Sequence, residues 1–303
     1  MLRSTVLGIA NLGFVRRVVT GGPGRRVALR FVAGEQLDDA IAVVRGLNAR
    51  GASASLDHLG ENVTELAQAQ AAATTYQAAI DRIEADGLQA NISVKLTQLG
   101  LDLPGDDDAD LIDKVVARAA AAGTSVTLDM EDHRYTDRTI DTCVRLAAQY
   151  PGRVGVAVQA YLHRTPADLA RLTQADLHVR LCKGAYREPR AVAYRRAARV
   201  DAAFASLAVQ LLESDAYAMI ATHDHRLIEH AKRQIRTLGR ARDTYEFQML
   251  YGIRRELQQQ LLDEGHRLRV YLPFGDAWYA YLMRRIAERP ANVRFFLESL
   301  ARG

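Results

Sequence analysis

The chain has 303 residues, of which 49% are hydrophobic and 25% are charged; this composition is typical of a folded globular protein and excludes global disorder. The formal net charge of +4 is too small to indicate nucleic-acid binding, so we expect no nucleic-acid partner. No run approaches the roughly 18 consecutive apolar residues of a membrane-spanning helix. The length suits one barrel domain as well as two average domains.

The basic N-terminal segment is the first feature along the chain. Glu35 is the first acidic residue, and six arginines precede it: Arg3, Arg16, Arg17, Arg25, Arg26 and Arg30. Such a start is typical of a mitochondrial presequence, of a helix lying on an anionic membrane, or of a solvated helix that ends at the glycine-rich turn 21–24. The segment contains no apolar core that ends in a cleavage-like site, so we expect no secretory signal. These three interpretations stay open.

From residue 51 the chain repeats a short apolar run, a polar turn and a helical stretch, the last with 3.6-residue periodicity as in 61–86 and 111–122. Thr165 followed by Pro166 predicts a helix N-cap. Eight strand–helix units predict an α/β fold, a (βα)8 TIM-type barrel over 51–303 with an N-terminal helical extension over 1–50; a doubly wound open sheet is the alternative. The predicted strands are 53–59, 91–96, 125–130, 154–161, 177–182, 218–222, 245–250 and 268–272.

The two cysteines, Cys143 and Cys182, lie in apolar surroundings and far from any metal-ligand spacing. Isolated thiols are typical of a reducing compartment. We therefore expect both to be buried and inert, and the protein to be cytoplasmic.

Polar or aromatic side chains follow the apolar run at the carboxyl end of every predicted strand, where the active site of a barrel forms. Lys95 and Arg180 lie within otherwise apolar strands, and an unpaired buried cation is costly. Lys95 is predicted to offer its charge to an anionic substrate; the alternative is an internal ion pair, for which Asp129 is the expected partner. Arg180 can donate fixed hydrogen bonds to a planar, electron-rich group.

The helix after the last strand carries Tyr281, Arg284, Arg285 and Glu288 on one face. Adjacent arginines, one oriented by a carboxylate, can bind a small carboxylate bidentately. A surface arginine pair with a salt bridge is the alternative. With Lys95, three cations would converge on one anion, so the residues themselves predict a small carboxylate ligand.

His223 and His225 lie two residues apart on a predicted strand, which would direct both side chains to the same side. A metal-dependent barrel hydrolase that uses this pair is therefore one alternative function. No second histidine pair accompanies it, so we expect no metal site. A non-catalytic amino-acid sensor is a further alternative. The sequence contains no glycine-rich dinucleotide motif or P-loop.

Six segments resemble those of the proline dehydrogenase family: ISVKLTQLG from residue 92, TLDMED (127–132), VRLCKGAY (179–186), ATH (221–223), YEFQMLYG (245–252) and YLMRRIAE (281–288). They resemble the stand-alone bacterial form over about residues 30–300. The resemblance implies a distorted barrel that holds FAD and oxidises L-proline to 1-pyrroline-5-carboxylate, the first step of proline degradation to glutamate. It further implies hydride transfer from proline C5 to flavin N5, a membrane quinone as electron acceptor, and pyrroline-5-carboxylate dehydrogenase as a partner. Membrane contact through the basic N-terminus would place the protein peripherally at the inner face of the membrane.

The same resemblance implies roles for individual residues. Asp129, beside Lys95, and Arg180, facing flavin N5, would be catalytic. The proline site would consist of Lys95, Leu181, Tyr186, Tyr271, Tyr281, Arg284, Arg285 and Glu288. FAD would contact Met130, Gln159, Arg180, Lys183, Gly184, Ala185, Thr222, His223 and Gln248.

Overall fold

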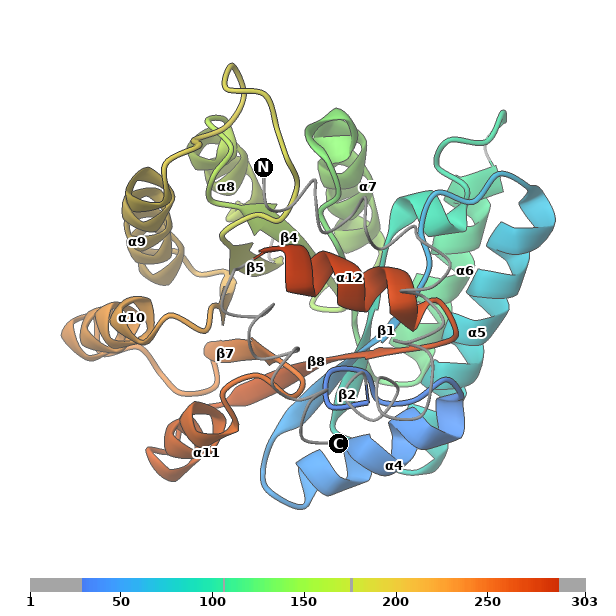
Figure 1. Ribbon diagram of the computed structural model, residues 1–303, viewed down its shortest axis with the longest axis horizontal. Coiled ribbons are helices and arrows are strands. Elements are labelled where there is room, and N and C mark those ends of the chain that lie inside the picture. The colour runs from blue at the N-terminus through green and yellow to red at the C-terminus, as the bar shows by residue number, and fades with distance from the viewer. Residues whose placement is uncertain (1–28, 106, 175–176, 289–303) are drawn as a thin grey trace.

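A computed structural model describes residues 29–105, 107–174 and 177–288, without the side chains of 107–108 and 284–288. Within these residues, parallel strands pair in chain order and β1 pairs with β8, so the sheet is a closed barrel (Figure 1). The predicted TIM-type barrel is confirmed and the open sheet is excluded. The strands are β1 (Ser53–His58), β2 (Ala90–Val94), β3 (Val126–Leu128), β4 (Val154–Gln159), β5 (His178–Cys182), β6 (Tyr217–Ala221), β7 (Tyr245–Leu250) and β8 (Leu268–Phe274).

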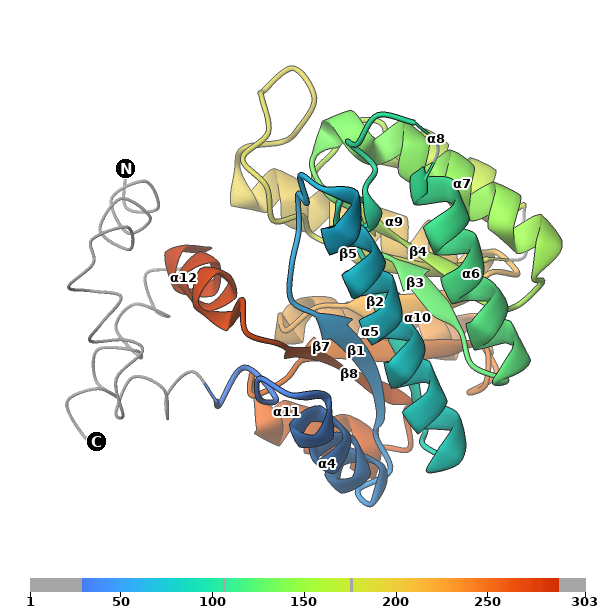
Figure 2. The same ribbon diagram turned by 90° about the vertical axis from the view of Figure 1, so that its right-hand side faces the viewer.

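Helices alternate with the strands and cover the outside of the barrel (Figures 1 and 2). Two short 3-10 helices, η1 (Leu96–Leu99) and η2 (His133–Tyr135), follow β2 and β3. The α-helices are α4 (Leu37–Asn48), α5 (Leu66–Ala85), α6 (Asp107–Ala121), α7 (Thr136–Gln149), α8 (Thr165–Leu172), α9 (Ala197–Glu213), α10 (His225–Thr237), α11 (Arg255–Asp263) and α12 (Trp278–Glu288).

The first and last described helices differ in where they pack on the barrel. In both views α12 lies beyond the end of β8, across the carboxyl ends of the strands (Figure 2). Helix α4 instead packs beside β1 and β8, with Ala40, Ile41, Val44 and Leu47 buried. Part of the expected N-terminal extension therefore lies in the outer helical layer. The domain boundary at residue 50 stays a prediction.

Several predicted element boundaries were wrong by a few residues. Helix α5 begins at Leu66 rather than at residue 61. Thr165 is the first residue of α8 rather than its N-cap, because its hydroxyl donates a hydrogen bond to the Gln159 carbonyl (2.6 Å). Strand β8 continues through Pro273 to Phe274, because these residues still pair with β1. Proline is tolerated there because pairing with β7 ends at Tyr271, so no β7 partner needs the missing N–H; its carbonyl accepts a hydrogen bond from Ala33 N (2.8 Å).

The two faces of the barrel sheet differ sharply in chemistry. Along each strand, every second side chain points outward to the helices. These side chains are apolar and buried, as Leu56, Ile92 and Val179 are. The alternate positions carry polar side chains that bond to non-neighbouring strands across the barrel, as Arg180 on β5 does with Ser93 on β2. Barrels of this type usually fill their interior with branched apolar residues. Here the interior is a network of buried polar groups.

The cysteines are both free, but only one is in the predicted environment. Cys143 on α7 is fully buried, and burial raises the pKa of its thiol, so it is inert as expected. Cys182 is only partly buried at the end of β5, and its thiol donates to the Val158 carbonyl (3.3 Å); its predicted burial was wrong. Among the described helices, none has the length and apolarity needed to cross a bilayer.

Candidate active site

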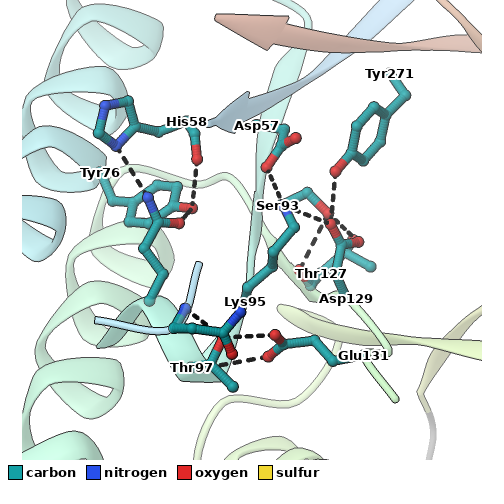
Figure 3. Close-up of polar contacts among 12 residues, drawn as sticks. Asp57, His58, Tyr76, Ser93, Lys95, Thr97, Thr127, Asp129, Glu131 and Tyr271 are labelled. Atoms are coloured by element: carbon teal, nitrogen blue, oxygen red, sulfur yellow. Dashed lines mark hydrogen bonds and ion pairs between the residues drawn. The ribbon is translucent and has the colours of Figure 1, made fainter. Parts of the chain in front are cut away.

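The Asp129 carboxylate follows β3 and is the centre of a buried cluster at the carboxyl ends of the strands (Figure 3). Its Oδ2 accepts a hydrogen bond from the Tyr271 hydroxyl (2.6 Å), and its Oδ1 accepts from Ser93 Oγ (2.7 Å) and Arg180 Nη1 (2.5 Å). Burial disfavours the charged carboxylate, but Arg180, Lys95 and these hydrogen bonds outweigh burial and lower the pKa of Asp129. Asp129 is therefore ionised at neutral pH.

Lys95, directly after β2, has a different nearest partner from the one expected for an internal ion pair. Its Nζ lies 2.7 Å from Asp57 Oδ1 on β1 and 3.8 Å from Asp129 Oδ2. The pairing with Asp129 is thus secondary, because Lys95 lies between carboxylates from both neighbouring strands (Figure 3). Burial alone would lower the pKa of Lys95, but the two carboxylates outweigh it and raise that pKa. Lys95 is a protonated cation whose charge is already compensated.

Arg180 on β5 is held in place on two of its three nitrogens. Nε donates to Gln248 Oε1 (2.6 Å), and Nη1 donates to Ser93 Oγ (3.0 Å) and to Asp129. The guanidinium carbon lies 5.2 Å from the centroid of the Tyr271 ring, a cation–π contact. Nη2 is buried and has no hydrogen-bond partner among the described residues. A buried donor of this kind requires an acceptor, and the planar, acceptor-rich ring of an oxidised flavin meets that requirement.

Three of the predicted FAD-contact residues are engaged with the backbone at the barrel mouth. Gln159 Nε2 donates to the Glu131 carbonyl (2.8 Å), and Thr222 Oγ1 accepts from Asp224 N (3.1 Å). His223 Nε2 accepts from Leu250 N (2.8 Å). These contacts fix the side chains at neighbouring strand ends. Met130 and Gln248 are buried at the same end of the barrel.

The loop after β5 contributes the other predicted FAD contacts, Lys183, Gly184 and Ala185, which are all partly buried. Lys183 Nζ pairs with Asp201 Oδ1 (2.6 Å) and Asp224 Oδ2 (3.2 Å), so its charge is compensated. Gly184 has φ of +110°, and a Cβ there would lie 2.4 Å from the Tyr161 ring. Only glycine lets the backbone pass this close to the ring.

The histidine pair of the alternative metal-dependent hydrolase does not form. Strand β6 ends at Ala221, and His225 is the exposed first residue of α10, so His223 and His225 do not alternate on one strand. His223 Nε2 is occupied by a backbone N–H. No group of three or more His, Cys, Asp or Glu side chains that could hold a metal occurs in the part of the chain the structure describes. The histidine-pair hydrolase loses its geometric basis.

The structure brings only some of the predicted proline-site residues to the Asp129 cluster. Tyr271 and Lys95 reach the Asp129 cluster. Tyr186 is partly buried beyond β5, and Tyr281 on α12 is buried. Leu181 was misplaced: it follows the inward Arg180 and so points to the outer face of β5, where it is fully buried in the apolar core. The helix α12 includes the positions of three further residues, but their side chains lie outside the described residues: Arg284, Arg285 and Glu288.

Sequence analysis missed several buried polar residues of this cluster. Ser93 bonds both Asp129 and Arg180, and Glu131 accepts from Thr97 N (3.0 Å) and Thr97 Oγ1 (2.5 Å). Burial raises the pKa of Glu131. Glu246 accepts from Gln248 Nε2 (2.6 Å). The available signal was period-two alternation: each of these residues occupies an inward position in or directly after a buried strand.

Comparisons with known proteins agree on one family. A family model described as "Proline dehydrogenase" matches residues 40–297. The chain is 40% identical over 281 residues to a "Proline dehydrogenase" of Deinococcus radiodurans, covering 91% of both chains. It is 35% identical over 300 residues to "Proline dehydrogenase 2" of Bacillus subtilis, covering 99% of both.

A solved structure shows the same fold at lower identity. Proline utilization A from Bdellovibrio bacteriovorus, inactivated by N-propargylglycine, superposes with a TM-score of 0.81 at 25% identity over 87% of this chain. The chain spans 32% of that longer protein. The matches to the family model and to the two full-length relatives show membership directly. The chain belongs to the proline dehydrogenase family, oxidoreductases of the first step of proline catabolism.

Proposed function

We propose that this chain binds FAD and uses it to oxidise L-proline to 1-pyrroline-5-carboxylate. The observation that carries the proposal is the buried Nη2 of Arg180, which has no partner among the described residues although the rest of its guanidinium is fixed. When bound, FAD would supply a two-electron acceptor: the C5–H bond of proline would break with its electron pair passing as hydride to flavin N5, the nitrogen lone pair would form the C=N bond, and the N–H proton would be released.

The chain's own residues would bind and orient the substrate. Arg284 and Arg285 would hold the proline carboxylate, with Glu288 orienting one of them. The ring would lie between Tyr186, Tyr271 and Tyr281. Asp129 and Tyr271 form the hydrogen-bonded floor beside Arg180. The carboxylate is the best handle on so small a substrate, since fixing it also fixes the position of C5.

The proline nitrogen must be neutral before C5 is oxidised, and a net positive site favours this state. Within the described cluster, Lys95 and Arg180 are balanced by Asp57 and Asp129. The excess positive charge therefore has to come from the arginine pair on α12. This assigns two roles to that pair: it holds the carboxylate and it lowers the pKa of the proline amine.

The decisive experiment is an absorption spectrum of the purified protein before and after anaerobic addition of L-proline. We expect visible flavin bands that bleach with proline and not with D-proline. Flavin that does not bleach would overturn the substrate assignment and keep the cofactor. A colourless protein that takes up no FAD would overturn the proposal. In that case, proline binding without flavin would favour the amino-acid sensor. Hydrolysis that is sensitive to chelators would favour the metal-dependent hydrolase.

The remaining parts of the proposal concern the electron acceptor and the location. Reduced flavin would pass its electrons to a membrane quinone, from a cytoplasmic protein held peripherally at the inner face of the membrane by its arginine-rich N-terminus. Pyrroline-5-carboxylate dehydrogenase would take the product. The family resemblance and the charge of the N-terminal segment support these assignments.

Deleting residues 1–30 should abolish co-sedimentation with anionic liposomes and leave turnover with a soluble quinone analogue intact. The physical reason is that arginine-rich segments are attracted to anionic lipid, and this attraction is screened by salt. Liposomes of neutral lipid are the control. Co-sedimentation that persists after the deletion would contradict membrane contact through this segment.

A further inference from the structure

A further buried ion pair lies deeper in the barrel than Arg180 and is not used by the proposed reaction. Glu246 Oε1 on β7 is 2.7 Å from Arg269 Nε on β8, and the Tyr217 hydroxyl donates to Glu246 Oε2 (3.1 Å). Arg269 Nη1 donates to the Ala54 carbonyl (3.0 Å) and to Asn91 Oδ1 (3.2 Å). Glu246 is 1% exposed. A buried pair of this kind is expensive to desolvate and stabilises a fold little, which calls for another role.

Gln248 connects this pair to Arg180. Its Nε2 donates to Glu246 Oε1 (2.6 Å) and to Met219 Sδ (3.0 Å), and its Oε1 accepts from Arg180 Nε (2.6 Å). A flipped amide would direct its oxygen at the Glu246 carboxylate and its N–H groups at the Arg180 N–H. Both contacts would be repulsive. The negative charge of Glu246 thus selects the amide orientation that Arg180 requires.

The orientation of Gln248 in turn decides which nitrogen of Arg180 stays available. Gln248 occupies Nε, and Ser93 and Asp129 occupy Nη1. Nη2 is then the nitrogen of Arg180 left without a partner in the described structure. Because a guanidinium is planar and rigid, fixing Nε and Nη1 also fixes the direction of Nη2.

We propose that Glu246 is a positioning residue for the cofactor: through Gln248 it holds Arg180 so that its charge stabilises the reduced flavin. This inference rests on the proposed function, because it takes FAD to be the acceptor for Arg180. A preorganised cation beside a group that gains negative charge stabilises that charge more than a mobile cation does. Glu246 therefore raises the reduction potential of a cofactor that it does not touch.

The test is the reduction potential of bound FAD in Glu246→Gln and Gln248→Met. Both variants should retain FAD and prefer its reduced form about tenfold less strongly, a fall of about 30 mV for a two-electron couple. The sign of the change in reduction potential separates two possible roles of Glu246, positioning through Gln248 and direct action of its charge on the flavin. If its charge acted on the flavin directly, its removal would raise the potential. The double variant should match Gln248→Met alone, since Glu246 acts through Gln248.

Tyr217→Phe is the matched control, because it removes one hydrogen bond to Glu246 and leaves the contacts with Gln248 and Arg269. Its flavin potential should equal that of the unmodified protein. If Glu246→Gln does not fold, Gln248→Met still decides, since it changes no charge. An unchanged or raised potential in the FAD-loaded variants would overturn the inference and leave the positioning of Arg180 to Asp129 and Ser93. Failure of the unmodified protein to bind FAD would instead overturn the proposed function.

Discussion

Replacing Arg180 by lysine should lower kcat/KM for proline about 10²–10³-fold, the range found when one preorganised donor is removed from an active site. Lysine retains the positive charge but not the planar fork that contacts Gln248, Ser93 and Asp129 together. It also offers no equivalent of the unpartnered Nη2. Steady-state kinetics with L-proline, together with the FAD content of the purified variant, measure the effect.

Arg240→Lys is the control for Arg180→Lys. Arg240 precedes β7, at the opposite end of the strands, and donates to the backbone carbonyls of Leu212, Ala216 and Thr244. Its substitution should lower stability without changing kcat/KM. If both variants lose activity equally, the loss in Arg180→Lys reflects general damage to the fold, and Arg180 has no special part in the reaction.

Replacing Lys95 by methionine should lower the free energy of unfolding at neutral pH by roughly 3–5 kcal/mol, the usual cost of breaking a buried ion pair. The reason is that Asp57, 1% exposed, would lose the cation that lies 2.7 Å away. Lys95→Met/Asp57→Asn should recover part of the loss, because it removes the unpaired charge as well. Urea unfolding of the single and double variants measures both effects.

The loss in Lys95→Met should depend on pH. Burial raises the pKa of Asp57, and without Lys95 little opposes that shift. A carboxyl group whose pKa is raised in the folded state does not change the free energy of unfolding below its unfolded pKa of about 3.9. It lowers that free energy increasingly as the pH rises from this value through the folded pKa. The variant should therefore approach the unmodified protein near pH 4 and fall below it toward neutral pH. A loss that is constant with pH would contradict an uncompensated Asp57 as its cause.

Lys232→Met provides the comparison for Lys95→Met. Lys232 on α10 pairs with Glu229 and Glu264, whose side chains are about one-third exposed. Water can solvate these carboxylates when the lysine is lost, so the expected cost is about 1 kcal/mol or less. An equal loss in the two lysine variants would indicate that the surroundings of Lys95 are far wetter than its contacts suggest.

The fold was predictable because its signal is repeated: eight apolar runs separated by helical stretches each carry the same information, and an error in one boundary leaves the barrel intact. Arg180 was also predictable, since a guanidinium inside an apolar strand must have partners. The choice of partner was harder. Lys95 lies between carboxylates on both neighbouring strands, and only the register of the folded barrel makes Asp57 the nearer one.

Two errors concern the direction in which side chains point. The family resemblance implies that Leu181 packs beside the proline ring, but Leu181 follows the inward Arg180, and neighbours on a strand point to opposite faces. His223 and His225 were placed on one strand, but the strand ends before them and α10 begins at His225. Glu246 was overlooked although period-two alternation places it inside the barrel; its contacts with β6 and β8 are not local in sequence.

The position of α4 has a consequence for the order in which the protein can fold during synthesis. The apolar face of α4 covers β1 and β8, so a segment made before the barrel strands packs on the last of them. Ala33 and Pro273, and likewise Gly34 and Gly275, are joined by backbone hydrogen bonds. Until β8 has left the ribosome, this face lacks one of the two strands that cover it. The barrel closes late, and the nascent chain carries a partly uncovered hydrophobic helix until it does.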